Sequence, residues 1–239
     1  MLNATINLYR NAYTGLNHRM WLLAVVMLIN RSGTMVLPFM TLYCKHIGYS
    51  TKQAGIVVAI YGIGSLVGAF IGGKISDRFG FYYTQFFVLF SGGVLFIILG
   101  QMNTYFSICV CTFFLSMVNE SFRPANATAI AHYSTSENRT QAFSIVRLAI
   151  NLGWGLGGAL GGFLASINYH LLFWVDGFTN ISAAFLLIWL LPKVSLAQQQ
   201  NLSHGKTTAV KAKPAYADKK FMYFIGLQLL FAFCFFQLF

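Results

Sequence analysis

Charged residues are scarce in this chain. They make up 9% of its 239 residues, against roughly 25% in soluble domains. Acids are scarcest, with 5 Asp and Glu against 16 Lys and Arg, while 57% of the residues are hydrophobic. So little charge excludes an ordinary soluble domain and predicts an integral membrane protein. The net charge of +11 is typical of nucleic-acid binders, but the basic residues gather in alternate loops, so we expect no nucleic-acid partner.

Several chemical signatures are also missing. The four cysteines, Cys44, Cys109, Cys111 and Cys234, have neither metal nor redox spacing. The chain has no phosphate-binding Gly-Lys-Ser/Thr loop, which argues against direct nucleotide-driven pumping. We therefore expect no enzyme activity, no metal and no cofactor. No cleavage-like site follows the first apolar run, so we interpret that run as a retained helix.

Long apolar runs dominate what is present. An apolar bilayer core of about 30 Å needs roughly 20 helical residues. Six runs meet this length, and a seventh begins near Phe221 and is still apolar at Phe239. The fold class expected is an all-α integral membrane bundle of six helices plus the start of a seventh. The six runs are Trp21–Tyr43, Ala54–Gly73, Tyr83–Gly100, Tyr105–Ala131, Ala142–Ile167 and His170–Leu191.

The distribution of Lys and Arg predicts the orientation. One side of the membrane would hold only Lys45 and Lys52. The other would hold Arg10, Arg19, Lys74, Arg78, Arg139, Lys193, Lys206, Lys211, Lys213, Lys219 and Lys220. This asymmetry places the amino terminus in the cytoplasm. Residues 193–220 are rich in Gln, Lys, Ala and Thr and read as a flexible linker, so we expect a six-helix domain over 1–192 and a truncated second domain over 221–239.

The loop after the second apolar run carries a motif. Gly73-Lys-Ile-Ser-Asp77-Arg78-Phe-Gly80 forms a short charged turn between two apolar runs. Gly-x-x-x-Asp-Arg-x-Gly at this place resembles the signature of major facilitator superfamily transporters. The resemblance covers residues 20–239 and implies one six-helix half, with a carboxy-terminal half expected in the full protein. It also implies that Gly73, Asp77, Arg78 and Gly80 act as a conformational latch.

Further motifs resemble the drug and proton antiporter branch of that family. They include Arg123-Pro124-Ala125-Asn126-Ala127 and a glycine-rich stretch of the fifth run, Gly153-Trp-Gly-Leu-Gly-Gly-Ala-Leu-Gly-Gly. The antiporter signature has a proline where this chain has Gly158, and a glycine where it has Ser144. The superfamily pattern is therefore matched more fully than the antiporter pattern.

Five ionisable residues fall inside the predicted spans. They are Arg31, Glu120, Arg123, Arg147 and Asp176. A charge at the bilayer centre costs at least ~2.5 kcal/mol on insertion scales, so these side chains should face a cavity or one another. Helix rise places Arg31 at the midplane and both Glu120 and Arg147 about 8 Å from the inner surface. Asp176 has no obvious partner and is interpreted as structural or as an outer-gate contact.

The expected substrate and proton path is lined by Arg31, Glu120, Arg123, Arg147 and Asn151. The fourth span carries a polar stripe of Ser116, Asn119, Glu120, Arg123 and Asn126 at helical spacing. Glu120 is the only acid in the inner two-thirds of the bundle and is the candidate proton carrier. The alternative is a permanent ion pair of Glu120 with Arg147 or Arg123 that only orders the helices.

Glycines recur every four residues in two spans. Gly64, Gly68 and Gly72 follow one face of the second span, and Gly153, Gly157 and Gly161 follow one face of the fifth. Small residues at this spacing let another helix approach closely. They indicate either packing inside the bundle or, by the family resemblance, a sliding interface with the opposite half.

The function expected is secondary active transport of a small solute by alternating access, with coupling to protons, in a bacterial inner membrane. Direction is open. The excess of arginines over acids in the expected cavity favours an anionic or zwitterionic substrate. The alternatives are a non-transporting membrane remnant, and a half-transporter that needs a partner chain or a second copy of itself.

Overall fold

The computed structural model describes residues 15–194 and 218–236. The chain divides into two compact units, Met1–Gln199 and Gln200–Phe239. Most of the predicted linker, 193–220, lies outside the described residues, as do Arg10, Lys206, Lys211 and Lys213. The described helix of the second unit is α11 (Lys219–Phe236), at the place where the sequence predicts the start of a seventh apolar helix.

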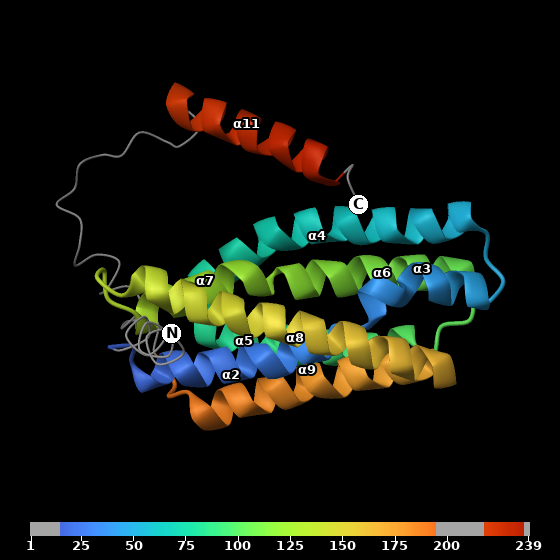
Figure 1. Ribbon diagram of the computed structural model, residues 1–239, viewed down its shortest axis with the longest axis horizontal. Coiled ribbons are helices and arrows are strands. Elements are labelled where there is room, and N and C mark those ends of the chain that lie inside the picture. The colour runs from blue at the N-terminus through green and yellow to red at the C-terminus, as the bar shows by residue number, and fades with distance from the viewer. Residues whose placement is uncertain (1–14, 195–217, 237–239) are drawn as a thin grey trace, which may run out of the picture. The chain divides into compact units, whose positions relative to one another are not determined.

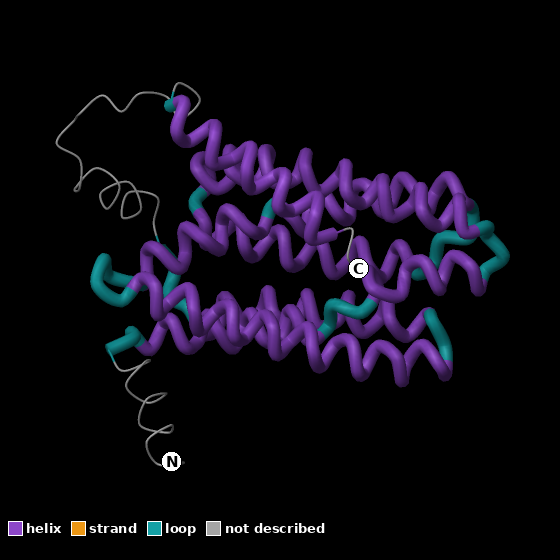
Figure 2. The backbone as a smooth tube through the Cα atoms, turned by 45° about the horizontal axis from the view of Figure 1, so that its top comes forward, coloured by secondary structure: helices purple, strands orange, loops and turns teal. Residues whose placement is uncertain are grey.

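The first unit confirms the expected all-α fold. Its described residues hold six helical stretches long and apolar enough to cross a membrane. They run side by side along one axis, and most of the connecting loops lie at the two ends (Figures 1 and 2). The stretches are α2 (His18–Ser32) with α3 (Val36–His46), α4 (Thr51–Phe79), α5 (Phe81–Leu99), α6 (Tyr105–Glu120) with α7 (Phe122–Tyr133), α8 (Arg139–Ile167) and α9 (His170–Leu190).

Two of the six stretches are interrupted, which the apolar pattern did not predict. The first is broken between α2 and α3, where α3 is offset from the line of α2 (Figure 1). The fourth changes from α6 to α7 at Ser121. A proline follows each interruption. Pro38 has no N–H for the Thr34 carbonyl, and Pro124 has none for the Glu120 carbonyl, so each removes a helical hydrogen bond close to the interruption.

The charged turn after the second span is shorter than expected. Helix α4 continues to Phe79 and α5 starts at Phe81, so Lys74, Asp77 and Arg78 lie on the last two turns of α4 and not in a loop. The connection is Gly80, whose φ of 83° lies in the left-handed region that glycine adopts without a Cβ clash. The expectation of a charged loop was therefore wrong, and helical geometry sets the spacing of Lys74, Asp77 and Arg78.

The glycines of the second span pack against the fourth span. Gly64, Gly68 and Gly72 are all buried in α4. A Cβ on Gly68 would collide with the Met117 carbonyl oxygen, and one on Gly72 would collide with the backbone of Ser121. The Ser121 hydroxyl also donates to the Gly68 carbonyl at 3.0 Å. This face of α4 is therefore occupied within the six-helix unit.

The glycines of the fifth span pack against the first span. Gly153, Gly157 and Gly161 are buried in α8. A Cβ on Gly153 would lie 2.6 Å from the Arg31 Cβ, and one on Gly161 would lie 2.8 Å from the Phe39 ring. For Gly155 and Gly158, such a Cβ would meet no described atom within 4 Å beyond its chain neighbours and the backbone of α8 itself. Gly153, Gly157 and Gly161 therefore pack against the first span, whereas Gly155 and Gly158 lie on a side of α8 that no described element covers.

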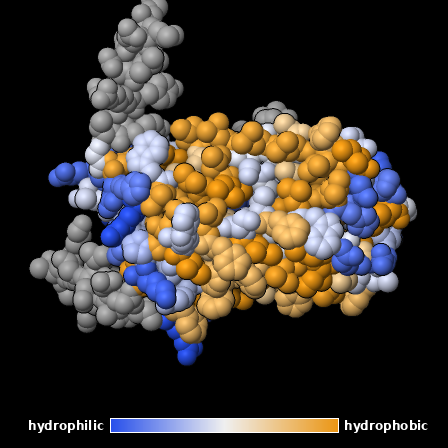
Figure 3. Space-filling view, turned by 90° about the horizontal axis from the view of Figure 1, so that it is seen from below, coloured by the Kyte–Doolittle hydropathy of each residue, from blue (hydrophilic) through white to orange (hydrophobic). Residues whose placement is uncertain are grey.

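The outside of the unit is apolar along most of its length. The face shown in Figure 3 is hydrophobic in the middle and hydrophilic toward both ends. Large apolar side chains are strongly exposed, with Trp189 at 81% and Phe70 at 73%. Surfaces of this kind mark contact with lipid or with another apolar surface.

Candidate functional site

A small polar cavity lies inside the six-helix unit. Its volume is about 30 Å³, and five of the six spans contribute to its wall. The polar lining groups are Asn30, Arg31, Thr34, Tyr61, Asn119, Glu120 and Asn180. The apolar lining groups are Leu37, Val88, Leu89, Phe96 and Phe122. The cavity therefore joins two of the five predicted path residues, Arg31 and Glu120.

Both charges stand near the middle of their spans. Arg31 is close to the centre of the stretch His18–His46, and Glu120 is close to the centre of Tyr105–Tyr133. The sequence predicts Glu120 nearer the inner surface, because a span of about 30 Å from Tyr105 would end soon after Glu120. The fourth stretch is longer than that, with 29 residues. The acid therefore belongs at the level of Arg31.

Glu120 has a close ionic partner. The Arg123 Nε forms an ion pair with Glu120 Oε2, and the Arg123 Nη2 donates to Oε1 at 3.3 Å. The carboxylate side chain is 14% exposed, whereas the Arg123 side chain is 72% exposed. This geometry matches the Glu120–Arg123 ion pair foreseen as the alternative to a free proton carrier. The two interpretations differ in whether the pair opens during function.

Among the described residues, Arg31 has no ion-pair partner of this kind. Its Nε atom is buried and makes no hydrogen bond. Glu120 is the acid that acts on it electrostatically, and Arg123 and Tyr61 are its other titratable neighbours. Because Glu120 is paired with Arg123, a guanidinium nitrogen remains available beside the cavity. An unsatisfied buried donor of this kind favours a bound acceptor.

The remaining predicted path residues lie elsewhere. Arg147 and Asn151 are exposed on α8, and no residue of α8 lines the described cavity. The polar stripe of the fourth span is also divided. Ser116 is buried against α4 at Gly64, and Asn126 accepts a hydrogen bond from Gln85 Nε2 of α5 at 3.3 Å. A role for the exposed face of α8 stays a prediction.

Sequence reasoning missed a buried polar network beside the cavity. Asp176 of α9 is completely buried, and its carboxylate accepts hydrogen bonds from the backbone N–H groups of Met35 and Val36 at 2.8–3.1 Å. One turn along α9, Asn180 accepts from Asn30 Nδ2 at 2.8 Å. The signal in the sequence was the acid itself, but its partners are backbone groups that no side-chain pattern reveals.

The predicted latch residues lie at one end of α4. Lys74, Asp77 and Arg78 are exposed, and the Arg78 guanidinium lies 5.6 Å from the centre of the Phe79 ring. Within the six-helix unit as described, neither Asp77 nor Arg78 forms an ion pair. Both are free to bind a group outside this unit.

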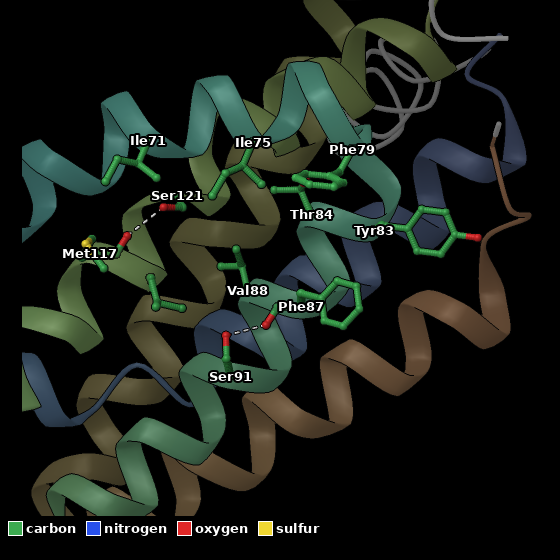
Figure 4. Close-up of a pocket in the computed structure, with 11 residues that line it drawn as sticks. Ile71, Ile75, Phe79, Tyr83, Thr84, Phe87, Val88, Ser91, Met117 and Ser121 are labelled. Carbon is green, nitrogen blue, oxygen red and sulfur yellow. Dashed lines mark hydrogen bonds between the residues drawn. The ribbon is translucent and has the colours of Figure 1, made fainter. Parts of the chain in front are cut away.

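A larger groove lies between α4, α5 and the fourth span. It encloses about 600 Å³, and Figure 4 shows its lining of mainly Ile, Phe, Val and Met side chains. Three of its four hydroxyls are used locally: Thr84 donates to the Gly80 carbonyl at 2.7 Å, Ser91 to the Phe87 carbonyl at 2.5 Å and Ser121 to the Met117 carbonyl at 2.8 Å. The groove therefore offers fewer polar groups that could orient a polar solute than the cavity of Arg31 and Glu120 does.

The bundle and its cavity define a multi-pass membrane protein with a polar site midway along its spans. The sequence profile of the Major Facilitator Superfamily matches residues 20–239, and the chain belongs to this family. This confirms the resemblance carried by the Gly73–Gly80 motif.

Two bacterial relatives are resistance proteins. The quinolone resistance protein NorA of Staphylococcus aureus (strain N315) is 25% identical over 167 residues, which cover 67% of this chain and 42% of the relative. Multidrug resistance protein 2 of Bacillus subtilis (strain 168) is 25% identical over 207 residues, which cover 84% of this chain and 50% of the relative. The chain thus spans about half the length of the curated relatives it matches.

Proposed function

We propose that this chain forms the amino-terminal half of a secondary active transporter that moves a small solute by alternating access. The observation that carries the proposal is the cavity at mid-span, with an unpartnered Arg31 nitrogen and several amide and hydroxyl groups around it. Polar and ionisable groups are expensive inside a membrane, and they mark solute or proton paths when they line a cavity. Membership of the Major Facilitator Superfamily supports the same function.

The proposed substrate is a small anion or zwitterion, and the proposed direction is export. Arg31 supplies a positive group, while the pair of Glu120 and Arg123 is internally neutral. The relatives named for quinolone and multidrug resistance support an organic solute. A quinolone carries a carboxylate, which is the kind of group that a guanidinium binds well.

Proton coupling would use Glu120. In this state the carboxylate is paired with Arg123, whose side chain is mainly exposed. Movement of Arg123 away from the acid would leave Glu120 facing Arg31 and the cavity. Protonation would then depend on the conformational state, as coupling requires. The proton carrier and the ordering ion pair are two states of the same residues in this proposal.

A second six-helix half would complete the solute path. Arg147 and Asn151, exposed on α8, would face it, and Asp77 and Arg78 would act as the latch on the cytoplasmic side. The chain would be organised as a six-helix domain over 1–192, a linker over 193–220 and the start of the second half over 221–239. The amino terminus would lie in the cytoplasm and the protein in the inner membrane, because Lys and Arg concentrate on that side.

The proposal is tested by replacing Arg31, whose buried Nε has no hydrogen-bond partner among the described residues. The variant is Arg31→Gln, and the matched control is Arg19→Gln, which makes the same change at the exposed start of α2. Norfloxacin export is measured in inverted membrane vesicles from cells that express the complete reading frame. Loss of a charge-assisted hydrogen bond should raise the half-saturating concentration by about 10-fold or more in Arg31→Gln and leave Arg19→Gln unchanged.

The competing substrate class is tested in the same vesicles. A lipophilic cation such as ethidium should be a poor substrate of the unmodified protein. Export of ethidium alone, unaffected by Arg31→Gln, would reject the anionic or zwitterionic substrate. Absence of export of any solute by the complete reading frame would favour the membrane remnant.

A further inference from the structure

We propose that Asp176 is a positioning residue that holds the break in the first span open and so sets where Arg31 and Thr34 stand in the cavity. The break is residues 33–35, between α2 and α3. Its consequence for solute binding rests on the proposed function, whereas the structural part of the inference stands on the described contacts alone.

Breaking a helix inside a membrane leaves backbone groups without partners. The first turn of each helix has free N–H groups and the last turn has free carbonyl groups. Lipid provides no hydrogen bonds, so such groups must be satisfied by the protein or by water in a cavity. A break near the middle of the stretch His18–His46 therefore needs a dedicated arrangement on both sides.

The amino-terminal end of α3 is satisfied by Asp176. Val36 N–H donates to Oδ2 at 2.8 Å, and Met35 N–H lies 2.9 Å from Oδ1 and 3.1 Å from Oδ2. Neither Met35, which precedes α3, nor any other residue at that end provides a side-chain cap from within the chain segment. A carboxylate at this place also complements the positive end of the helix dipole. Asp176 thus replaces a local cap from a position 140 residues away.

The carboxy-terminal end of α2 carries the opposite charge. Arg31 lies in the last turn of α2, where a cation complements the negative end of the dipole. The Arg31 carbonyl accepts from Thr34 N–H at 3.1 Å. The same arginine therefore stabilises the break through its helix end and presents its side chain to the cavity.

The glycines of α8 receive the backbone of the break. A Cβ on Gly157 would lie 3.1 Å from the Ser32 carbonyl oxygen and 3.3 Å from the carbonyl oxygens of Arg31 and Thr34. On the opposite side, a Cβ on Gly33 would collide with the Thr179 hydroxyl. The break is thus enclosed by α8 and α9, and Asp176 is the group that bonds to it.

The break decides which groups line the cavity. Arg31, Thr34 and Leu37 all belong to its wall, and they come from α2, the break and α3 respectively. Asp176 does not line the cavity, and its carboxylate is taken up by backbone N–H groups. Its role is therefore to position other groups, which replaces the interpretation of Asp176 as an outer-gate contact.

Hydrogen–deuterium exchange of the purified chain in lipid nanodiscs tests the cap. The measured signal is amide exchange in peptides covering residues 33–39, which contain the Val36 N–H. Asp176→Ala should accelerate exchange there about 10- to 100-fold, because a hydrogen bond to a charged group is lost. Asp176→Asn keeps one acceptor oxygen, so its exchange rate should lie between those of the unmodified chain and Asp176→Ala.

The matched control is Gln85→Ala. It removes another buried hydrogen bond between helices, from Gln85 of α5 to Asn126 of α7. It should lower thermal stability without changing exchange at residues 33–39. Equal exchange at these residues in the unmodified chain and Asp176→Asn would overturn the proposal, and so would acceleration by Gln85→Ala as large as that by Asp176→Asn. If Asp176→Ala does not fold, the exchange of residues 33–39 in Asp176→Asn alone tests the proposal.

The transport consequence is measured separately in vesicles with the complete reading frame. Asp176→Asn should raise the half-saturating norfloxacin concentration several-fold more than Gln85→Ala does, because Arg31 and Thr34 are displaced. Faster exchange at 33–39 with unchanged half-saturation would refute the effect on the cavity and keep the cap. Unchanged exchange would refute the cap whether or not the protein transports norfloxacin.

Discussion

The contact between the second and fourth spans makes a sharp stability prediction for Gly68→Ala. The added Cβ would collide with the Met117 carbonyl oxygen and lie 2.9 Å from the Met117 Cα. These atoms belong to the backbone of α6, so rotation of a side chain cannot relieve the collision. The two helices must separate, and the 3.0 Å bond from the Ser121 hydroxyl to the Gly68 carbonyl must lengthen or break.

The magnitude follows from a comparison with Gly62→Ala. Gly62 lies in the same helix, and a Cβ there would have no described atom within 4 Å apart from its chain neighbours and its own helical backbone. Both substitutions gain the helix propensity of alanine over glycine, about 1 kcal/mol, so their difference isolates the steric cost. Overpacking costs about 1–3 kcal/mol, so Gly68→Ala should be less stable than Gly62→Ala by this amount.

The assay is thermal unfolding of the purified chain in detergent, followed by circular dichroism. At about 2–4 °C per kcal/mol for a protein of this size, Gly68→Ala should unfold roughly 2–12 °C below Gly62→Ala. Equal melting temperatures would show that α4 and α6 are not in the described contact. The regular glycines would then be available for a sliding interface.

Two further predictions concern the break and the acid of the cavity. Gly33→Ala should lower the melting temperature because its Cβ would meet the Thr179 side chain, and Thr179→Gly in the same chain should restore part of the loss; no restoration would place the collision elsewhere. Glu120→Gln, measured in vesicles with and without a pH gradient, should abolish proton-driven export while keeping solute exchange. Glu137→Gln, an exposed acid outside the spans, serves as its control, and proton-driven export that survives Glu120→Gln would refute the carrier assignment.

The spans could be read from the sequence because apolar run length reports directly on the bilayer. The described helices reproduce all six runs, and some extend several residues beyond them, as α4 does at both ends and α8 at its start. The ends were underestimated because helices continue past the apolar core into charged segments, such as the turns that carry Lys74 and Arg78. The length of an apolar run therefore indicates the thickness of the bilayer core more closely than it indicates the length of the helix.

The cavity was only partly predictable. Arg31 and Glu120 were found because a charge in an apolar span is conspicuous. Arg147 was grouped with them by estimated depth, but depth along a helix does not specify the direction of a side chain, and Arg147 is exposed on α8. Asp176 was interpreted as structural or as an outer-gate contact without a partner, since its partners are the backbone N–H groups of Met35 and Val36. Hydropathy and helical spacing describe side chains, and they carry no information on backbone groups freed by a break.

The charged residues within the spans therefore form two groups: those that lie at the helix ends of the break and those that pair with another side chain. Asp176 and Arg31 lie at the two helix ends created by the break, where each has the sign that the helix dipole favours. Glu120 is neutralised by Arg123. Among the described residues, the Arg31 Nε is a buried donor beside the cavity that has no hydrogen-bond partner. The break thus explains how an arginine is held at mid-span, and it links the fold of the first span to the charge of the solute proposed for the cavity.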